Sequence, residues 1–526
     1  MRKTLTLLLI GFCCLFAGKV DAQQRYLDEM FTDVVRIDSI VYGSNISVFP
    51  PAGLKDLIMD VYYPAGDQDT NRALVLLACT GNFLPRPING GANGTIKDST
   101  VVELAQRLAK RGYVVASFFY RQGWSFTNPS QDIQTATLLQ AAYRGIQDAR
   151  TVARFFREDV AEYGNTYGIN PDKIAIGGVG TGGYISMGAV FLDDYEKVKL
   201  PKFTDFTTGI PFVDTTVHGN IWGTNQTQQN VPNHLGYSSE IQFAFNLGGA
   251  LGDSSWVDPG DAPVVSFHTP QDPNAPYDIG VVIVPTTGNT VIDEAAGSYA
   301  VAKLQNKYGN HQIFIDAGLT DPFTVAANTN NYDADLAMNL EGLMPFDKPF
   351  TPGAYDCGFG GVQVPKVPEG SPWDWWDQGA FISDWDLATG GNPFPGVVMN
   401  CNSLASNPDM SATKGRTYID SVMGYLAPRM VIAMSLYTTS IENELFDRAV
   451  TVFPNPAQNL LTIRNENASN LISEVRLMDV SGRTLQYNSG LRTSEVTISR
   501  GNIPSGVYIL QIRANKGMTT RKVIFE

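Results

Sequence analysis

The sequence predicts an α/β domain, a mostly parallel sheet with helices on both faces, followed by a small all-β sandwich. Three observations predict it. Almost unbroken apolar strands alternate with helical segments, a long helical segment separates two of these strands, and short β-type runs between turns begin after residue 447. Strands buried on both faces are apolar throughout, and their alternation with helices is typical of parallel sheets. The 526 residues suit two such units and a short end segment.

The charge excludes two classes of partner. There are 38 Lys and Arg residues against 52 Asp and Glu residues, which gives a net charge of −14. A nucleic-acid-binding protein needs a basic surface, and electrostatic docking on an anionic membrane needs one too. We therefore expect no nucleic-acid partner, and the 43% of apolar residues suffices for large cores.

The N-terminus has the pattern of a secretory signal peptide. Met1-Arg2-Lys3 is basic, residues 5–17 are apolar, and Val20-Asp21-Ala22 supplies small residues for cleavage after Ala22. The apolar run is too short to span a membrane, and no later run approaches about 20 apolar residues, so we expect no transmembrane segment in the mature chain.

Three cysteines remain after removal of Cys13 and Cys14 with the signal peptide. Export permits a disulfide, for which Cys357 and Cys401 are the expected pair, with Cys79 left as a buried thiol. Three unpaired thiols are equally compatible with the sequence.

The first domain is predicted as a series of strands and helices. Strands are expected at 57–63, 73–78, 113–119, 173–177 and 262–268, with a last core strand at 312–316; helices are expected at 101–111, 135–158, 181–191 and 418–436.

The most informative motif is the glycine-rich turn in residues 174–184, Ile-Ala-Ile-Gly-Gly-Val-Gly-Thr-Gly-Gly-Tyr. A strand enters this turn and a helix leaves it at Thr181, which is the setting of a G-x-S-x-G nucleophile elbow. With the flanking segments 144–150 and 168–173, the motif resembles the esterase and lipase branch of the α/β-hydrolases, over roughly residues 55–436. The resemblance implies hydrolysis of carboxylic esters by a Ser–His–Asp triad, without a cofactor.

The chain departs from that triad at two positions. Gly180 stands at the nucleophile position, where glycine also relieves the backbone strain of an elbow. Asp272, in the loop after strand 262–268, matches the position of the acid. The base should be a histidine after the last core strand, but no histidine follows His311; the others are His218, His234 and His268.

The loop after strand 73–78 stands where the family has its oxyanion loop. Backbone N–H groups of Gly81 and Asn82, with that of Thr181, are the expected oxyanion donors. Cys79 and Thr181 are conceivable replacement nucleophiles, but neither has an evident base. Residues 178–183 also fit G-x-G-x-x-G, a weak sign of a dinucleotide site, but no acidic residue lies about 20 residues further on at the end of a clear second strand.

A long insertion is expected at about 316–417. Its Trp373, Trp375 and Trp376, with Trp124 from another loop, are predicted either to stack on sugar or aromatic ligands or to close the insertion onto the core. The scattered acidic residues predict no metal site.

The C-terminal segment carries several ordered motifs: Val452-Phe453-Pro454-Asn455-Pro456, then residues 479–483, then Ile503-Pro504-Ser505-Gly506-Val507-Tyr508 and a basic last strand. They resemble the type A sorting domain of the type IX secretion system over about the last 75 residues. The resemblance implies handling by that secretion machinery and a secreted or cell-surface protein.

The expected domain organisation is a signal peptide (1–22), a lead-in (23–54), an α/β-hydrolase-like domain (55–440), a linker (441–448) and the sorting domain (449–526). The two triad losses together predict a non-catalytic protein that binds a small molecule or a glycan or ester ligand. The alternatives are an active ester hydrolase with a displaced nucleophile and a purely structural surface protein.

Overall fold

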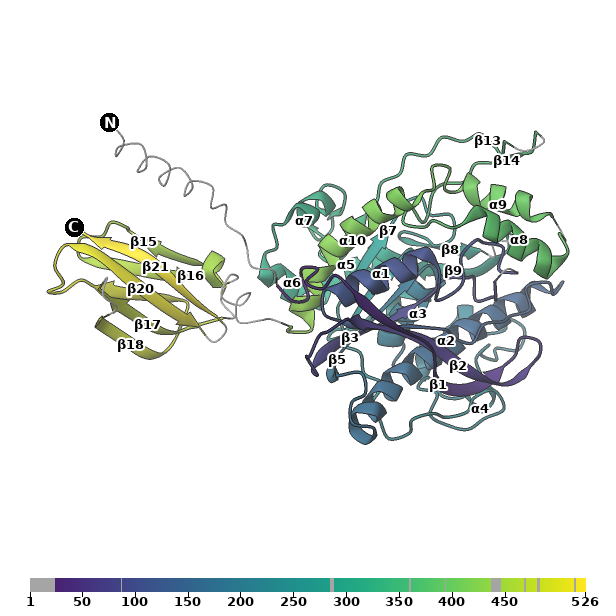
Figure 1. The fold of residues 1–526 in the computed structure, drawn as a ribbon, viewed down its shortest axis with the longest axis horizontal. Coiled ribbons are helices and arrows are strands. Elements are labelled where there is room, and N and C mark those ends of the chain that lie inside the picture. The colour runs from purple at the N-terminus through teal and green to yellow at the C-terminus, as the bar shows by residue number, and fades with distance from the viewer. Residues whose placement is uncertain are drawn as a thin grey trace, which may run out of the picture.

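The computed structural model describes residues 24–526 except 87, 284–287, 359–360, 393, 437–445, 468–469, 480–482 and 515–516. The predicted signal peptide and most of the predicted linker lie outside the described residues. Figure 1 shows both folded parts, the α/β domain in purple to green and the C-terminal domain in yellow.

The α/β domain is built on an eight-stranded sheet in the order β1-β2-β4-β3-β5-β6-β7-β12. β1 pairs antiparallel with β2, and β2 pairs antiparallel with β4. From β4 onward in that order, every pair of neighbouring strands is parallel. This arrangement is that of the α/β-hydrolase fold, so the predicted fold class is confirmed. The strands are β1 (Val34–Ser47), β2 (Gly53–Pro64), β3 (Arg72–Ala78), β4 (Val114–Phe118), β5 (Ile169–Val179), β6 (Phe243–Leu247), β7 (Val264–His268) and β12 (Leu343–Pro345).

Helices cover both faces of the sheet. The helix α1 (Ser99–Lys110) connects β3 to β4. The helix α2 (Gln131–Glu162) then connects β4 to β5, which lies on the other side of β3 in the sheet. Because such crossovers are right-handed, steps in opposite directions place α1 and α2 on opposite faces. The helix α10 (Ala412–Ala433) packs beside α1, whereas α3 (Thr181–Phe191) packs beside α2.

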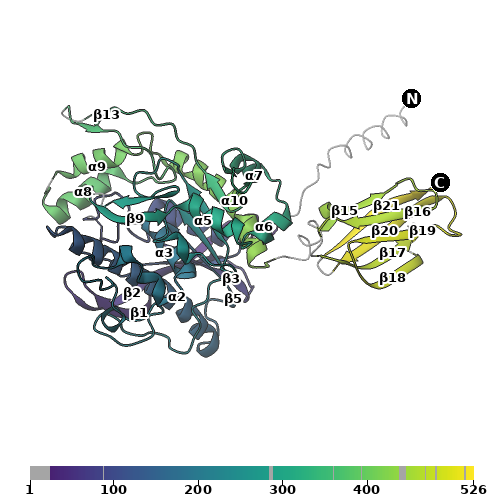
Figure 2. The same ribbon diagram turned by 180° about the vertical axis from the view of Figure 1, so that it is seen from behind.

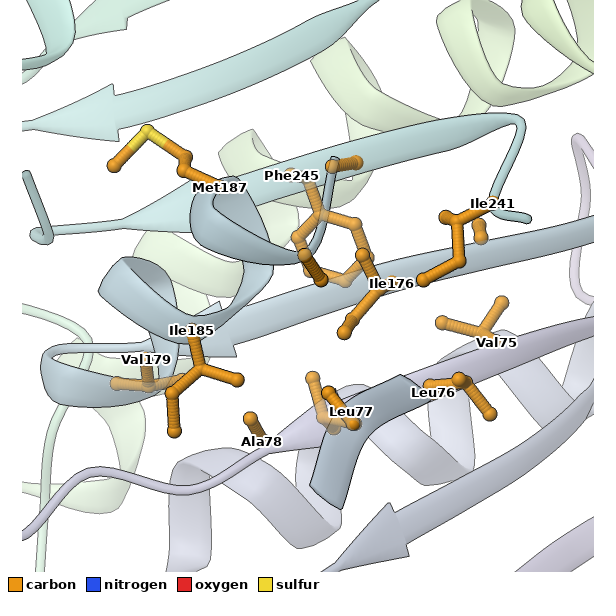
Figure 3. Packing of buried hydrophobic residues seen from close by; sticks show 14 of the residues in the cluster. Val75, Leu76, Leu77, Ala78, Ile176, Val179, Ile185, Met187, Ile241 and Phe245 are labelled. Carbon is orange, nitrogen blue, oxygen red and sulfur yellow. The ribbon is translucent and has the colours of Figure 1, made fainter. Parts of the chain in front are cut away.

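The core beneath α3 positions the turn that precedes that helix. Figure 3 shows Ile185 of α3 beside Val179 and above Ala78, and the ring of Phe245 from β6 beside Ile176. All these side chains are at most 2% exposed. Each buried aliphatic or aromatic side chain contributes about 1.5–3 kcal/mol, so the elbow is anchored on both sides by well-packed strands.

Two expected boundaries of this domain change. Residues 34–47, expected in a lead-in, form β1 and pair with β2 along its length. Residues 312–316, expected as the last core strand, lie in the short helix α6 (Gln312–Ala317), and β12 is the last strand of the sheet. The apolar run Ile313-Phe314-Ile315 is too short to separate helix from strand, and Gly318 ends the helix in the left-handed conformation.

The segment expected as one insertion is therefore divided by β12. Before it lie α7 (Pro322–Ala327), β10 (Tyr332–Asp333) and β11 (Met338–Asn339); after it lie β13 (Ala354–Asp356), β14 (Gln363–Pro365), α8 (Gln378–Thr389) and α9 (Gly396–Ala405). A disulfide joins Cys357, after β13, to Cys401 in α9, with 5.5 Å between their Cα atoms. It ties the β13–β14 hairpin to α9, and Cys79 is a buried free thiol.

The remaining elements of the α/β domain are short. They are α4 (Thr215–His218), α5 (Ser298–Lys307), the short 3₁₀ helices η1 (Tyr195–Val198), η2 (Pro201–Phe203) and η3 (Ser254–Trp256), and the hairpin of β8 (Ile279–Ile283) and β9 (Thr290–Ala296). In Figures 1 and 2, β9 lies at the same end of the domain as α8 and α9, away from α6.

The C-terminal domain consists of two antiparallel sheets, β15-β16-β19 and β18-β17-β20-β21. Its core is separate from that of the α/β domain and includes Leu461, Leu477, Leu510 and Val523. The strands are β15 (Val450–Phe453), β16 (Leu460–Asn465), β17 (Ile472–Met478), β18 (Thr484–Thr493), β19 (Glu495–Ser499), β20 (Gly506–Ala514) and β21 (Met518–Phe525). The predicted all-β sandwich is confirmed.

Candidate functional site

The turn between β5 and α3 has the backbone of a nucleophile elbow. Gly180 has φ 53° and ψ −117°, a conformation that disfavours residues with a side chain. Its N–H donates to the carbonyl of Leu247 at 2.8 Å. The neighbouring glycines allow close approach, because a Cβ on Gly182 would lie 2.3 Å from the carbonyl oxygen of Ala78.

The space above Gly180 is taken by another side chain. A Cβ at this position would lie 2.3 Å from Oγ1 of Thr80, in the loop after β3. A serine here would therefore have to displace Thr80 before its hydroxyl could face a substrate. The elbow presents no nucleophile, and Thr80 would have to rotate to make room for one.

Asp272 lies in the loop after β7 and is enclosed by the segment that follows β14. Its carboxylate accepts the N–H of Asn274 at 2.7 Å, and burial raises its pKa to about 7. A Cβ on Gly370 would lie 2.6 Å from Oδ1 of Asp272. A Cβ on Gly248 would lie 3.4 Å from Oδ2 of Asp272 and 3.3 Å from Cζ2 of Trp373, so the indole of Trp373 lies close to the acid.

His268, which lies near Asp272, is hydrogen-bonded through both ring nitrogens to groups of the fold. Nε2 of His268 is 3.7 Å from Oδ2 of Asp272 and donates to the carbonyl of Ala275 at 3.2 Å. Nδ1 accepts the hydroxyl of Ser298 at 2.7 Å. Burial lowers the pKa of His268 to about 4, so the ring is neutral at pH 7 and forms no ion pair with Asp272.

The other three histidines have structural partners. His218 shares a hydrogen bond with the backbone of Asp214, His234 contacts Glu158, and His311 contacts the carbonyl of Glu341. Residues 346–348, which follow β12, are Phe-Asp-Lys. No imidazole thus stands between Asp272 and Gly180 in the described part of the chain.

The expected oxyanion segment is close to the elbow. Gly81 has φ 130° and Asn82 has φ 54°, and within the described residues no acceptor is present for the amide N–H groups of Gly81, Asn82 and Thr181. The hydroxyl of Tyr120 connects the loop after β3 to the start of α3, since it lies 3.1 Å from the carbonyl oxygen of Cys79 and 3.1 Å from Oγ1 of Thr181. Burial raises the pKa of the Cys79 thiol well above its usual range.

The four tryptophans do not form one exposed surface. Trp373 is fully buried, and Trp124 is buried with Nε1 donating to the carbonyl of Asn82 at 2.8 Å. The ring of Trp375 faces the guanidinium of Arg416, and Nε1 of Trp376 donates to Oδ1 of Asn400 at 2.9 Å. Trp373 and Trp124 are therefore part of the packing between loops and core.

An apolar cavity beside the elbow helix was not predicted. It lies between α2, α3, η1 and η2, and Tyr184, four residues after Gly180, forms part of its wall. Its walls come from segments far apart in the sequence, and the only local sign is the position of Tyr184 on the elbow helix.

Among the residues that the structure describes, no three His, Cys, Asp or Glu side chains are grouped to hold a metal ion. None of the described helices combines the length and the apolar character needed to cross a membrane.

The comparisons identify the last domain. The family described as "Secretion system C-terminal sorting domain" matches residues 451–526, which span β15 to β21. The C-terminal domain is a type IX sorting domain. The protein is therefore exported, either to the cell surface or into the medium.

The α/β domain is similar in fold to solved esterase structures. Esterase 2 of Thermogutta terrifontis phosphorylated by paraoxon is 18% identical, with a TM-score of 0.32, over 59% of this chain and 82% of that one. The butyrate-bound form of that esterase is 16% identical, with a TM-score of 0.32, over 59% and 83% of the two chains. Values this low carry no conclusion about activity, and the fold assignment rests on the strand order. Comparison with curated proteins finds no match.

Proposed function

We propose that the exported α/β domain is a non-catalytic binding protein for a small ligand. The observation that carries this proposal is the elbow at Gly180, which has no nucleophile and whose side-chain space is filled by Thr80. A Ser–His–Asp reaction needs the nucleophile, a base within hydrogen-bond reach of it, and an acid that orients the base.

The acid position supports the same proposal. An acid of a working triad is ionised and bonded to its histidine, whereas Asp272 has a pKa raised to about 7 and lies against Gly370 and Trp373. The unpaired amide groups at Gly81, Asn82 and Thr181 are compatible with a polar group of a ligand near the elbow.

The second candidate function is an ester hydrolase with a displaced nucleophile. Cys79 would have to ionise in a fully buried site that raises its pKa, and the hydroxyl of Thr181 is shared with Tyr120, which is not a base at neutral pH. These contacts favour the binding function.

The test uses the purified mature protein with a panel of short- and medium-chain aryl esters and a fluorophosphonate label. We expect no turnover above background and no labelled residue. Turnover that persists in Gly180→Ala, together with a labelled residue, would overturn the proposal and locate the displaced nucleophile.

A single reversion provides a sharper version of this test. Gly180→Ser is expected to give less than a twofold rise in hydrolysis of an aryl butyrate, because Thr80 fills the space and no histidine is in place. The variant should lose about 1–3 kcal/mol of unfolding free energy, since φ is positive at this position. A large gain in hydrolysis would show that a base does reach the elbow.

A further inference from the structure

The apolar cavity beside α3 has a narrow, almost entirely hydrocarbon wall. Its empty space is about 580 Å³, which includes open solvent at the mouth, and the enclosed part is narrow. The narrow cross-section of the cavity favours a slender alkyl chain over a ring system.

Two of the polar groups in the wall are already used by the protein. The hydroxyl of Tyr143 donates to the carbonyl of Gly219 at 2.9 Å, and Nε1 of Trp256 donates to the carbonyl of Lys197 at 2.9 Å. No Lys or Arg side chain is part of the wall formed by the described residues. The cavity therefore offers nothing to neutralise a charged ligand, which would lose its hydration on binding.

The hydroxyl of Tyr184 is the exception. It is buried and has no hydrogen-bond partner within the part of the chain that the structure describes. A buried hydroxyl without a partner costs about 1–3 kcal/mol, so a ligand group that accepts its hydrogen bond would recover stability. Burial and the nearby Asp272 raise the pKa of Tyr184, so the hydroxyl keeps its proton and acts as a donor.

We propose that this cavity binds a slender amphiphile, whose unbranched alkyl chain fills the apolar walls and whose uncharged hydroxyl or carbonyl group accepts a hydrogen bond from Tyr184. The inference rests on the proposed binding function and names its ligand class. It uses Asp272 only as a neighbour of the hydroxyl, and no bond of the ligand is broken.

A loop beside the cavity offers a route for such a chain. Phe203 and Phe212 are part of the wall and are joined by a backbone hydrogen bond of 2.9 Å at the base of the loop 204–211. Phe206, within this loop, is fully exposed, and Ile210 is largely exposed. An exposed apolar loop above an apolar cavity is where an alkyl chain would leave water.

The experiment is calorimetric titration of the full-length mature protein with 1-hexanol, 1-octanol and 1-decanol. Each added methylene should lower Kd about fourfold until the cavity is filled. Saturable binding with this dependence on chain length supports the proposal, whereas no saturation, or equal affinity for all three alcohols, overturns it.

Variants of the wall test the location. Ala142→Leu on α2 fills the cavity and should weaken 1-octanol at least tenfold, whereas Ala161→Leu, an exposed position on the same helix, should leave Kd unchanged. If Ala142→Leu fails to fold, Ile292→Phe on β9 fills the cavity from the opposite wall and serves the same purpose. Unchanged binding in a folded wall variant would place the alcohol elsewhere and overturn the proposal.

Tyr184→Phe tests the polar contact. We expect 1-octanol to bind about three- to tenfold more weakly, with unfolding free energy unchanged or slightly raised, because the variant removes an unpaired hydroxyl. Unchanged affinity together with lower stability would assign the hydroxyl a purely structural role and remove it from the site.

The amphiphile proposal and the non-catalytic function can be overturned independently of each other. If no alcohol binds and no ester is hydrolysed, the amphiphile is excluded while the non-catalytic function stands. If the fluorophosphonate labels the protein, the non-catalytic function is overturned whatever the alcohols do.

Discussion

Two cavities in the described part of the α/β domain differ in size and in whether their buried polar groups are hydrogen-bonded within the protein. The larger, about 1510 Å³ of mostly open space, lies near the start of β6 and β7 and has a wall of mixed polarity that includes Arg150 and Arg154. The guanidinium of Arg150 is hydrogen-bonded within the protein, because it donates to the backbone carbonyls of Ile221, Leu192 and Ala189. The smaller cavity, by contrast, keeps the hydroxyl of Tyr184 unpaired. Size alone therefore does not indicate a ligand site; the smaller cavity combines an apolar wall with a hydroxyl that has no partner among the described residues.

The largest expected effect comes from removing a buried cation of the larger cavity. Arg150→Met should lower the unfolding free energy by about 3–5 kcal/mol, because three carbonyl groups lose their donor. All seven tryptophans lie in the α/β domain, so urea unfolding followed by tryptophan fluorescence reports on that domain alone. The half-exposed Arg416→Met is the control, with an expected change below about 0.5 kcal/mol. An equally small effect of Arg150→Met would mean that its hydrogen bonds are not structural.

A smaller effect, confined to a pH window, is expected at Asp272 beside the apolar cavity. A carboxyl whose pKa is raised on folding holds its proton longer in the folded state, so its contribution to stability is lost as pH rises from about 4 to about 7. Asp272→Asn should match the native protein near pH 4 and exceed its unfolding free energy by about 2–4 kcal/mol at pH 8. A difference that does not change between pH 4 and pH 8 would show that Asp272 is ionised throughout.

The smallest effect on stability is expected at the exposed loop above the cavity. Phe206→Ser should change the unfolding free energy by less than about 0.5 kcal/mol, because the side chain has no packing to lose. If the loop is the route into the cavity, stopped-flow fluorescence should show slower association of 1-octanol with unchanged Kd. Unchanged association would place the route elsewhere without affecting the site.

The fold was largely predictable because its main strands are buried on both faces. β3, β4 and β7 consist entirely of buried residues, and their composition marks them in the sequence. β12 was missed because it has three residues and ends in Pro345, so no periodic pattern can form. Residues 312–316 have a strand-like composition, but they form part of the helix α6, in which only Phe314 is buried.

The candidate site was predictable where one short segment builds it. The glycine cluster around Gly180 requires close contact of strand and helix, and this requirement is local. The cavity is different, since its wall combines α2, α3, η2 and β9, whose side chains meet only in the folded domain. The same holds for Trp373, whose burial beside Asp272 depends on a chain segment about one hundred residues away.

The disulfide between Cys357 and Cys401 bears on how long an exported protein survives outside the cell. It encloses α8, where Leu387 is almost fully exposed, within a span of 44 residues. Extracellular proteases cut at exposed turns, and Gly390, which follows Leu387 at the end of α8, lies in an exposed turn. After a cut near Leu387 the two fragments would stay covalently joined, and the protein would run as a single band on a gel until a reductant was added. The disulfide would thus keep the two parts of the chain together after cleavage at this site.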